Sequence, residues 1–186
     1  MASLYAYQNC TLCPRDCKVD RTQGKKGFCG ETATLRIAHM GPHFGEEPSF
    51  SGIQGSGTVF FSGCSGQCFF CQNYQISIQH AGSEYSQEKF LEEVKSLIRK
   101  GVHNINFVTP DHFWPHIKTL CRSLREEGLK IPMIFNSSGY QKAELIEDYA
   151  EDVDIFLPDF KFSQKNLAQR CMGDERYPEI ALKANC

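Results

Sequence analysis

From Gly57 onward, short apolar runs alternate with amphipathic segments, and this alternation restricts the possible folds more than any other feature of the sequence. The apolar runs are rich in β-branched and aromatic residues and predict strands, whereas apolar residues three and four positions apart predict helices. The predicted strands are 58–62, 104–108, 131–135 and 153–157, and the predicted helices are 86–100, 113–127 and 142–149. Strands that alternate with helices form parallel βαβ units, so we expect an α/β fold.

The loops that follow the four predicted strands contain cysteines or polar residues. They are 64–73, 109–112, 136–139 and 158–161. In parallel α/β folds the carboxyl ends of the strands meet at one rim, and ligands bind there. We therefore expect residues 57–186 to form a core with an active site at this rim. Residues 1–56 show no sustained helical or strand period, and we expect a loop-rich, cysteine-rich segment there.

Ten residues are cysteines, and seven of them fall into two clusters. The first cluster is Cys10, Cys13, Cys17 and Cys29, and the second is Cys64, Cys68 and Cys71. Cysteines two or three residues apart can converge on one metal centre, whereas disulfides usually join distant segments. The first ten residues lack a basic region followed by an apolar stretch, so we expect no export signal and a reducing, cytoplasmic location. Metal binding is therefore the favoured interpretation of both clusters.

The second cluster has the spacing C-x3-C-x2-C and directly follows the first predicted strand. Three thiolates on one loop can bind three irons of a [4Fe–4S] cluster and leave the fourth iron open, whereas an electron-transfer cluster normally has all its irons bound by protein. An open position is typical of a catalytic metal site. The alternative is a zinc site in which a residue such as His80 supplies the fourth ligand.

The first cluster supplies four thiolates, which are enough to saturate a metal. Zinc and an auxiliary [4Fe–4S] cluster both accept four cysteines, so both interpretations stay open. Zinc would stabilise a segment that has little core of its own. A cluster would relay electrons or anchor a partner.

Several segments resemble radical S-adenosylmethionine (SAM) proteins related to pyruvate formate-lyase activating enzyme. They are GEEPSFSGIQGSGTVFFSGCSGQCFFCQNYQIS from Gly45 to Ser77, then NINFVTPDH, PMIFNSSGY and VDIFLPDFK, and the N-terminal CTLCPRDCKVDR. The resemblance implies a (β/α)6 TIM-like barrel with about four βα units present, so we expect a core that is incomplete on its C-terminal side. It also implies a [4Fe–4S] cluster whose open iron binds SAM, and reductive cleavage of SAM to a 5′-deoxyadenosyl radical that abstracts hydrogen.

The resemblance also assigns residues to these cofactors. Cys64, Cys68 and Cys71 match the cluster ligands, and Phe70 matches an aromatic position near the adenine. The other positions expected to contact SAM are Asn73, Thr109, Asn136, Ser138, Asp159 and Lys161. The chain departs from the family at 108–111, where VTPD replaces the Gly-Gly-Glu-like stretch that contacts the methionine amino group. His112 and Trp114 are expected to line the substrate opening, and Cys121 is expected to be buried in a helix.

Two classes of function account for these features. The favoured one is a radical SAM oxidoreductase of the activating-enzyme type, and the alternative is a non-catalytic iron–sulfur electron carrier or a truncated metal-binding remnant. The enzyme implies an external electron donor of the flavodoxin or ferredoxin type and, as a protein substrate, a glycyl radical enzyme. The net charge of −2 and the absence of a basic segment argue against nucleic acid as a partner. No apolar run approaches the roughly 20 residues that span a membrane.

Overall fold

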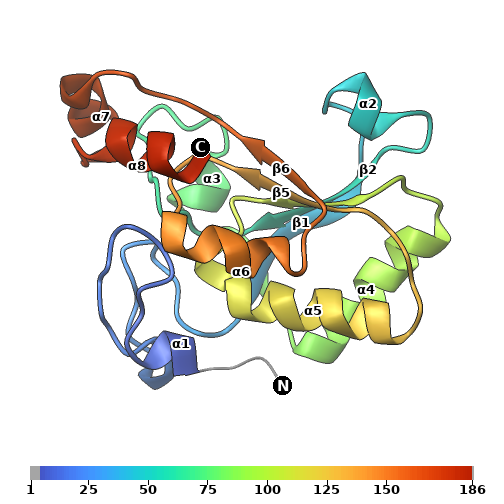
Figure 1. Cartoon of the computed structure of the whole chain (residues 1–186). Coiled ribbons are helices and arrows are strands. Elements are labelled where there is room, and N and C mark those ends of the chain that lie inside the picture. Colours follow the sequence, from blue (N-terminus) through green and yellow to red (C-terminus); the bar gives the residue numbers. More distant parts are fainter. Residues whose placement is uncertain (1–4, 186) are drawn as a thin grey trace.

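The computed structural model describes residues 5–185 and contains a six-stranded sheet with helices packed on one face (Figure 1). The strands are β1 (Arg36–His43), β2 (Ser56–Phe61), β3 (Ser83–Glu84), β4 (Ile105–Val108), β5 (Met133–Ser137) and β6 (Ile155–Pro158). Their order across the sheet is β3-β1-β2-β4-β5-β6. The pairs β2–β4, β4–β5 and β5–β6 are parallel, which confirms the predicted α/β fold. The outermost residues of the two predicted segments, 1–4 and Cys186, lie outside the described residues.

The longest helices are α4 (Gln87–Arg99) and α5 (Trp114–Glu126), close to their predicted bounds. The hydroxyl of Ser86 caps α4 by accepting a hydrogen bond from the backbone N–H of Lys89 at 3.2 Å. The remaining helices are α1 (Tyr5–Gln8), α2 (Pro48–Ser51), α3 (Tyr74–Ser77), α6 (Ile146–Ala150), α7 (Lys165–Met172), α8 (Tyr177–Asn185) and the 3-10 turns η1 (Arg21–Gln23), η2 (Asp111–Phe113) and η3 (Ala143–Leu145). Within residues 5–185, every helix is too short or too polar to cross a lipid bilayer.

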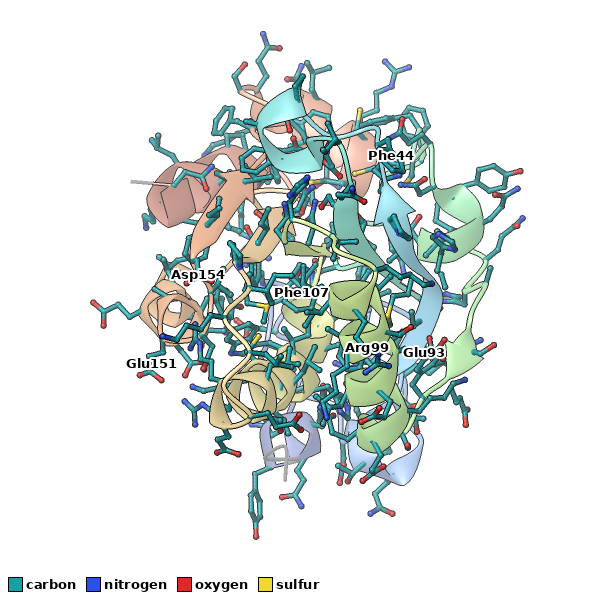
Figure 2. The ribbon with its side chains drawn as sticks, turned by 90° about the vertical axis from the view of Figure 1, so that its right-hand side faces the viewer. Phe44, Glu93, Arg99, Phe107, Glu151 and Asp154 are labelled. Carbon is teal, nitrogen blue, oxygen red and sulfur yellow. The ribbon has the colours of Figure 1, made fainter. Side chains whose placement is uncertain are left out.

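The two faces of the sheet have different environments because successive side chains of a strand point in opposite directions. Val59 and Phe61 of β2 and Phe107 of β4 pack in the core against α4 and α5. Their neighbours Phe60 and Val108 face the other way and line a cavity. Phe107 lies in the middle of the molecule, whereas Arg99 and Glu151 lie on its outside (Figure 2). One face of the sheet is therefore covered by helices, and the other is available for binding.

Strand β1 is the main difference from the expected fold, because it lies inside the segment 1–56 that we expected to be loop-rich. It pairs antiparallel with β2 and extends the sheet on the side away from β4. Its sequence RIAHMGPH contains Gly41 and Pro42, which are depleted in strands, so the pattern gave little sign of it. The part of β1 around Pro42 pairs only with β2, and an edge of this kind tolerates the missing N–H of proline.

The sheet in the described residues is open, with β3 and β6 at its edges. Four of its strands, β2, β4, β5 and β6, run parallel to one another. The expected count of about four βα units and the closure into a TIM-like barrel stay predictions.

Candidate active site

A cavity of about 610 Å³ lies against the uncovered face of the sheet and extends to the carboxyl ends of the parallel strands. All ten residues that were expected to bind the cluster or SAM line it. They are Cys64, Cys68, Phe70, Cys71, Asn73, Thr109, Asn136, Ser138, Asp159 and Lys161. These residues come from four separate loops, and the parallel sheet brings the four loops to one rim.

The cysteine loop, defined here as residues 63–71, follows β2 directly. Backbone and hydroxyl donors point at two of its sulfur atoms: the N–H of Gly66 lies 3.3 Å from Cys64 Sγ, and the hydroxyl of Ser77 lies 3.2 Å from Cys71 Sγ. A Cβ on Gly66 would lie 3.6 Å from Cys64 Sγ and 3.7 Å from Cys68 Sγ, so both thiols face this glycine. Hydrogen bonds to ligand sulfur atoms are one of the means by which proteins tune metal centres.

Burial governs the protonation of these thiols. Burial, together with the nearby carboxyl of Asp111, raises the pKa of Cys64 to about 12. Burial also raises the pKa of Cys68, which the ammonium group of Lys161 partly offsets. These thiols are therefore protonated at neutral pH, and binding of a metal must displace their protons.

The donor set of the cysteine loop fits an iron–sulfur cluster. Within residues 5–185, no three Cys, His, Asp or Glu side chains are drawn together at metal-binding distance. The three thiols nevertheless line one cavity on one loop, and thiolates are the ligands that such clusters use. The hydroxyl of Ser138 is buried, lines the same cavity and has no hydrogen-bond partner among the described residues, so it is available to a bound molecule.

The loop after β4 enters the cavity with a strained backbone at Thr109. This residue has φ of +46°, which β-branched residues rarely adopt, and strain of this kind is concentrated at functional sites. Its N–H donates a 2.7 Å hydrogen bond to the carbonyl of Asn136, the next rim residue. This hydrogen bond extends the β4–β5 pairing by one residue and holds Thr109 at the cavity wall.

The loops after β5 and β6 are held together by Tyr177, a fully buried residue at the start of α8. Its hydroxyl donates to the carbonyl of Ser138 at 2.8 Å and accepts from the N–H of Lys161 at 2.7 Å. Lys161 also forms an ion pair with Asp159 at 2.5 Å. No sequence motif pointed to Tyr177, because its role depends on a contact between segments far apart in the sequence.

Two further cavity residues were also missed. His43 ends β1, and Glu46 follows it in the next loop. Burial raises the pKa of Glu46, and the neighbouring imidazole of His43 counteracts this rise. The only sign of a role for these two residues was their place in or next to the GEEPSF segment of the family resemblance. No helix or strand was predicted there that would have positioned them. Ser77 was missed for a similar reason, since it lies six residues beyond Cys71.

The structure corrects the expectation for His112 and Trp114, neither of which lines the cavity. Both are buried: the indole of Trp114, the first residue of α5, donates to Asp148 at 2.6 Å, and a ring nitrogen of His112 lies 2.8 Å from the Ser62 carbonyl. The turn η2 and the start of α5 direct these two side chains away from the cavity. Cys121 is fully buried in α5, as predicted. His80 lies 2.9 Å from Glu31, so its ring is engaged there and not with the cysteine loop.

The four N-terminal cysteines lie in one region around Arg21. Cys10, Cys13 and Cys29 are buried. A Cβ on Gly27 would lie 3.3 Å from Cys17 Sγ and 3.4 Å from Cys29 Sγ, so these two thiols lie on the same side of that glycine.

Arg21 is only 1% exposed, yet none of its contacts is a carboxylate within ion-pairing distance among the described residues. Its guanidinium donates to the carbonyls of Thr32 and His112, both at 2.7 Å, and lies 3.6 Å from Cys10 Sγ. It also lies over the Tyr7 ring, 4.6 Å from the centroid. Burial raises the pKa of Cys29 to about 11, and the positive charge of Arg21 acts in the opposite direction.

Comparison with known proteins places this geometry in a family. The family model described as the Radical SAM superfamily matches residues 58–184. The protein is also similar to Uncharacterized protein MJ0674 of Methanocaldococcus jannaschii, with 30% identity over 181 residues that cover 94% of this chain and 52% of that protein. The chain therefore spans about half the length of this relative.

Proposed function

Because the chain belongs to the radical SAM superfamily, we propose that the cavity binds a [4Fe–4S] cluster at Cys64, Cys68 and Cys71 together with SAM. The observation that carries the proposal is the convergence of four rim loops on one cavity, with the three thiols at one of its walls. When bound, the cluster supplies the electron that cleaves the sulfonium of SAM, which releases methionine and a 5′-deoxyadenosyl radical for hydrogen abstraction.

The other rim residues position SAM in this proposal. Phe70 is 52% exposed at the cavity wall, and its ring is available to stack on the adenine. The unpartnered hydroxyl of Ser138 and the strained loop at Thr109 offer polar contacts to the methionine or ribose part of SAM. Asp159 and Lys161 supply opposite charges to the hydroxyls and the carboxylate.

We assign the finer function by resemblance: an activating enzyme that takes its electron from a flavodoxin or ferredoxin and installs a radical on a protein such as a glycyl radical enzyme. A cytoplasmic location is part of this proposal, because a reducing compartment keeps thiols free for metal binding. The nine cysteines in residues 5–185 are free thiols.

The decisive experiment is anaerobic reconstitution with iron and sulfide, followed by electron paramagnetic resonance of the reduced protein with and without SAM. We expect a [4Fe–4S] signal that changes when SAM is added, together with formation of 5′-deoxyadenosine and methionine. The triple variant Cys64→Ala, Cys68→Ala, Cys71→Ala should lose both results. Zinc binding at these three cysteines in place of a cluster would overturn the proposal.

The position of Cys171 near the cysteine loop is the observation that favours the electron-carrier alternative. Cys171, near the end of α7, accepts a hydrogen bond from the N–H of Phe69 through its carbonyl at 3.1 Å, and its thiol lies close enough to Cys68 to raise the pKa of that thiol. If Cys171 bound the fourth iron, the cluster would be closed and would not respond to SAM. We expect Cys171→Ser to leave the cluster signal and its SAM response unchanged. A SAM response that appears only in Cys171→Ser would favour the carrier.

A further inference from the structure

Arg15 connects the N-terminal cysteines to the cysteine loop. It lies in sequence between Cys13 and Cys17. Its Nε donates to the carbonyl of Ser65 at 2.9 Å, and its Nη2 donates to the carbonyl of Gly66 at 3.2 Å. Both acceptors belong to the stretch between Cys64 and Cys68, so the guanidinium holds the backbone that separates two of the proposed cluster ligands.

The same side chain is anchored on its far side. Arg15 also donates to the carbonyl of Met172 at 2.6 Å and to that of Gly173 at 3.2 Å, at the end of α7. Its guanidinium lies 3.8 Å from the centroid of the Phe28 ring. Four carbonyls and an aromatic ring therefore fix the position of the guanidinium. A flexible surface arginine would lack such a set of contacts.

Two more contacts join the same segments. The side-chain amide of Gln67 donates to the carbonyl of Phe28 at 2.6 Å. Gly63 meets the residue after Phe28, because a Cβ on Gly63 would lie 2.5 Å from the carbonyl oxygen of Cys29. Each contact from the N-terminal side thus comes from Cys29 itself or from a residue within two positions of a cysteine of the first cluster.

We propose that metal binding by the N-terminal cysteines holds the cysteine loop in its cluster-binding conformation, and that Arg15 is the positioning residue that transmits this effect. The inference rests on the proposed function, because it concerns the loop that carries the cluster. Gln67 has φ of +46°, and the loop contains two glycines, so its backbone is not fixed by local preference alone. Contacts with residues outside the loop must therefore fix its conformation. Such contacts matter for metal binding, because groups that orient metal ligands change metal affinity.

The test separates the two metal sites. In a background with Cys64, Cys68 and Cys71 all changed to serine, the first cluster of cysteines is the remaining group of four closely spaced thiols that can bind Zn²⁺. Zinc content is measured by elemental analysis, and backbone hydrogen exchange of residues 63–68 is followed with and without Zn²⁺. We expect Zn²⁺ to slow exchange in this loop. Adding Arg15→Gln should abolish the slowing at equal zinc content, and the exposed control Arg170→Gln should retain it.

A second measurement uses the protein with its native cysteines. Arg15→Gln should weaken retention of the reconstituted cluster about tenfold, as loss of a residue that orients metal ligands commonly does, and should broaden its paramagnetic signal. Arg15→Lys keeps the charge but not the planar set of donors, so we expect it to restore only part of the loss.

Two results would overturn the inference: zinc-dependent protection that survives Arg15→Gln, or zinc that binds without slowing exchange in the loop. Either result would leave the proposed function intact if the unmodified protein still assembles a cluster that responds to SAM. Conversely, an unmodified protein that assembles no cluster would refute the proposed function while the exchange experiment could still succeed. Circular dichroism of each variant distinguishes loss of the contact from loss of the fold.

Discussion

Gly139 lies directly against the backbone of Asp159, so closely that a Cβ on the glycine would lie 2.1 Å from the Asp159 carbonyl oxygen. Gly139 also has φ of +72°, in the region that favours glycine. The loops after β5 and β6 therefore meet backbone to backbone, and this contact sets how far Asp159 and Lys161 stand from Asn136 across the cavity.

Replacement of Gly139 should separate these two loops. In Gly139→Ala the new methyl group meets a carbonyl, so the loss of stability should exceed the roughly 1 kcal/mol expected for alanine at positive φ alone. SAM affinity should fall because the rim residues move. Gly128→Ala is the matched control, since Gly128 has φ of +77° and a Cβ added there would have no neighbouring atom within 4 Å. Equal destabilisation of the two variants in urea unfolding would contradict the proposed contact.

Loss of the Ser77 hydroxyl should alter the redox behaviour of the bound cluster. The Ser77 hydroxyl lies 3.2 Å from Cys71 Sγ, and a hydrogen bond to a ligand sulfur stabilises the more negative, reduced cluster. We expect Ser77→Ala to shift the reduction potential to a more negative value, measured by redox titration monitored by paramagnetic resonance. Ser163→Ala, at an exposed position, should leave the potential unchanged. A positive shift in Ser77→Ala would be the opposite of this expectation.

Thr109 should show opposite effects on stability and on binding. Thr109→Gly removes the strain of a β-branched residue at φ of +46°, worth about 1–2 kcal/mol, and adds the entropic cost of glycine, about 0.5–1 kcal/mol. The net effect on the free energy of unfolding should be neutral or stabilising by about 1 kcal/mol. SAM binding should weaken because the hydroxyl is gone. A variant that is clearly less stable than the unmodified protein would show that the strain had been misjudged.

Neighbouring residues Asp111 and His112 should give opposing pH dependences of stability. Burial raises the pKa of Asp111 to about 6, so between roughly pH 4 and 6 the folded state holds a proton that the unfolded state has released. This contribution to stability falls as pH rises. Burial lowers the pKa of His112 to about 3, so from there to roughly pH 6.5 the unfolded state binds the extra proton. This contribution rises with pH, and the two nearly cancel between about pH 4 and 6.

The variant Asp111→Asn separates the two contributions. Without the carboxyl, the His112 contribution is unopposed, and stability should fall as pH is lowered from about 6 to 4, by up to about 1.4 kcal/mol per pH unit. Urea unfolding at several pH values measures this slope. Glu126→Gln, on the exposed side of α5, should keep the profile of the unmodified protein. A flat profile in Asp111→Asn would argue against a neutral, buried His112.

The sequence predicted the parts of this molecule that local patterns encode. The four parallel strands, α4 and α5 have strong apolar periodicity. The C-x3-C-x2-C spacing of the cysteine loop by itself indicates metal binding. The rim loops could be chosen because parallel topology places strand ends together, whereas the individual residues within them came from the family resemblance. Strand β1 escaped prediction because its Gly41 and Pro42 are poor strand formers, so its pairing with β2 and, at its start, with β3 makes it a strand.

Residues next to a motif were harder to place than the motif itself. His112 and Trp114 immediately follow a rim loop, and sequence proximity suggested that they share its environment. The 3-10 turn η2 and the start of α5 instead direct both side chains into the core, where the Trp114 indole has its partner in Asp148. Tyr177 and Arg15 illustrate the converse, because each acts on a loop that is distant in sequence.

The buried guanidinium of Arg21 has a consequence for how this protein matures. Without metal, the Cys29 thiol beside it stays protonated because burial raises its pKa to about 11. The fold then encloses a positive charge with no carboxylate in direct contact among the described residues, which is costly. Four thiolates bound to Zn²⁺ would carry a net charge of −2 and would offset the positive charge of Arg21. Metal uptake at these cysteines would therefore lower the cost of burying Arg21, so the stability of this segment would depend on the supply of metal.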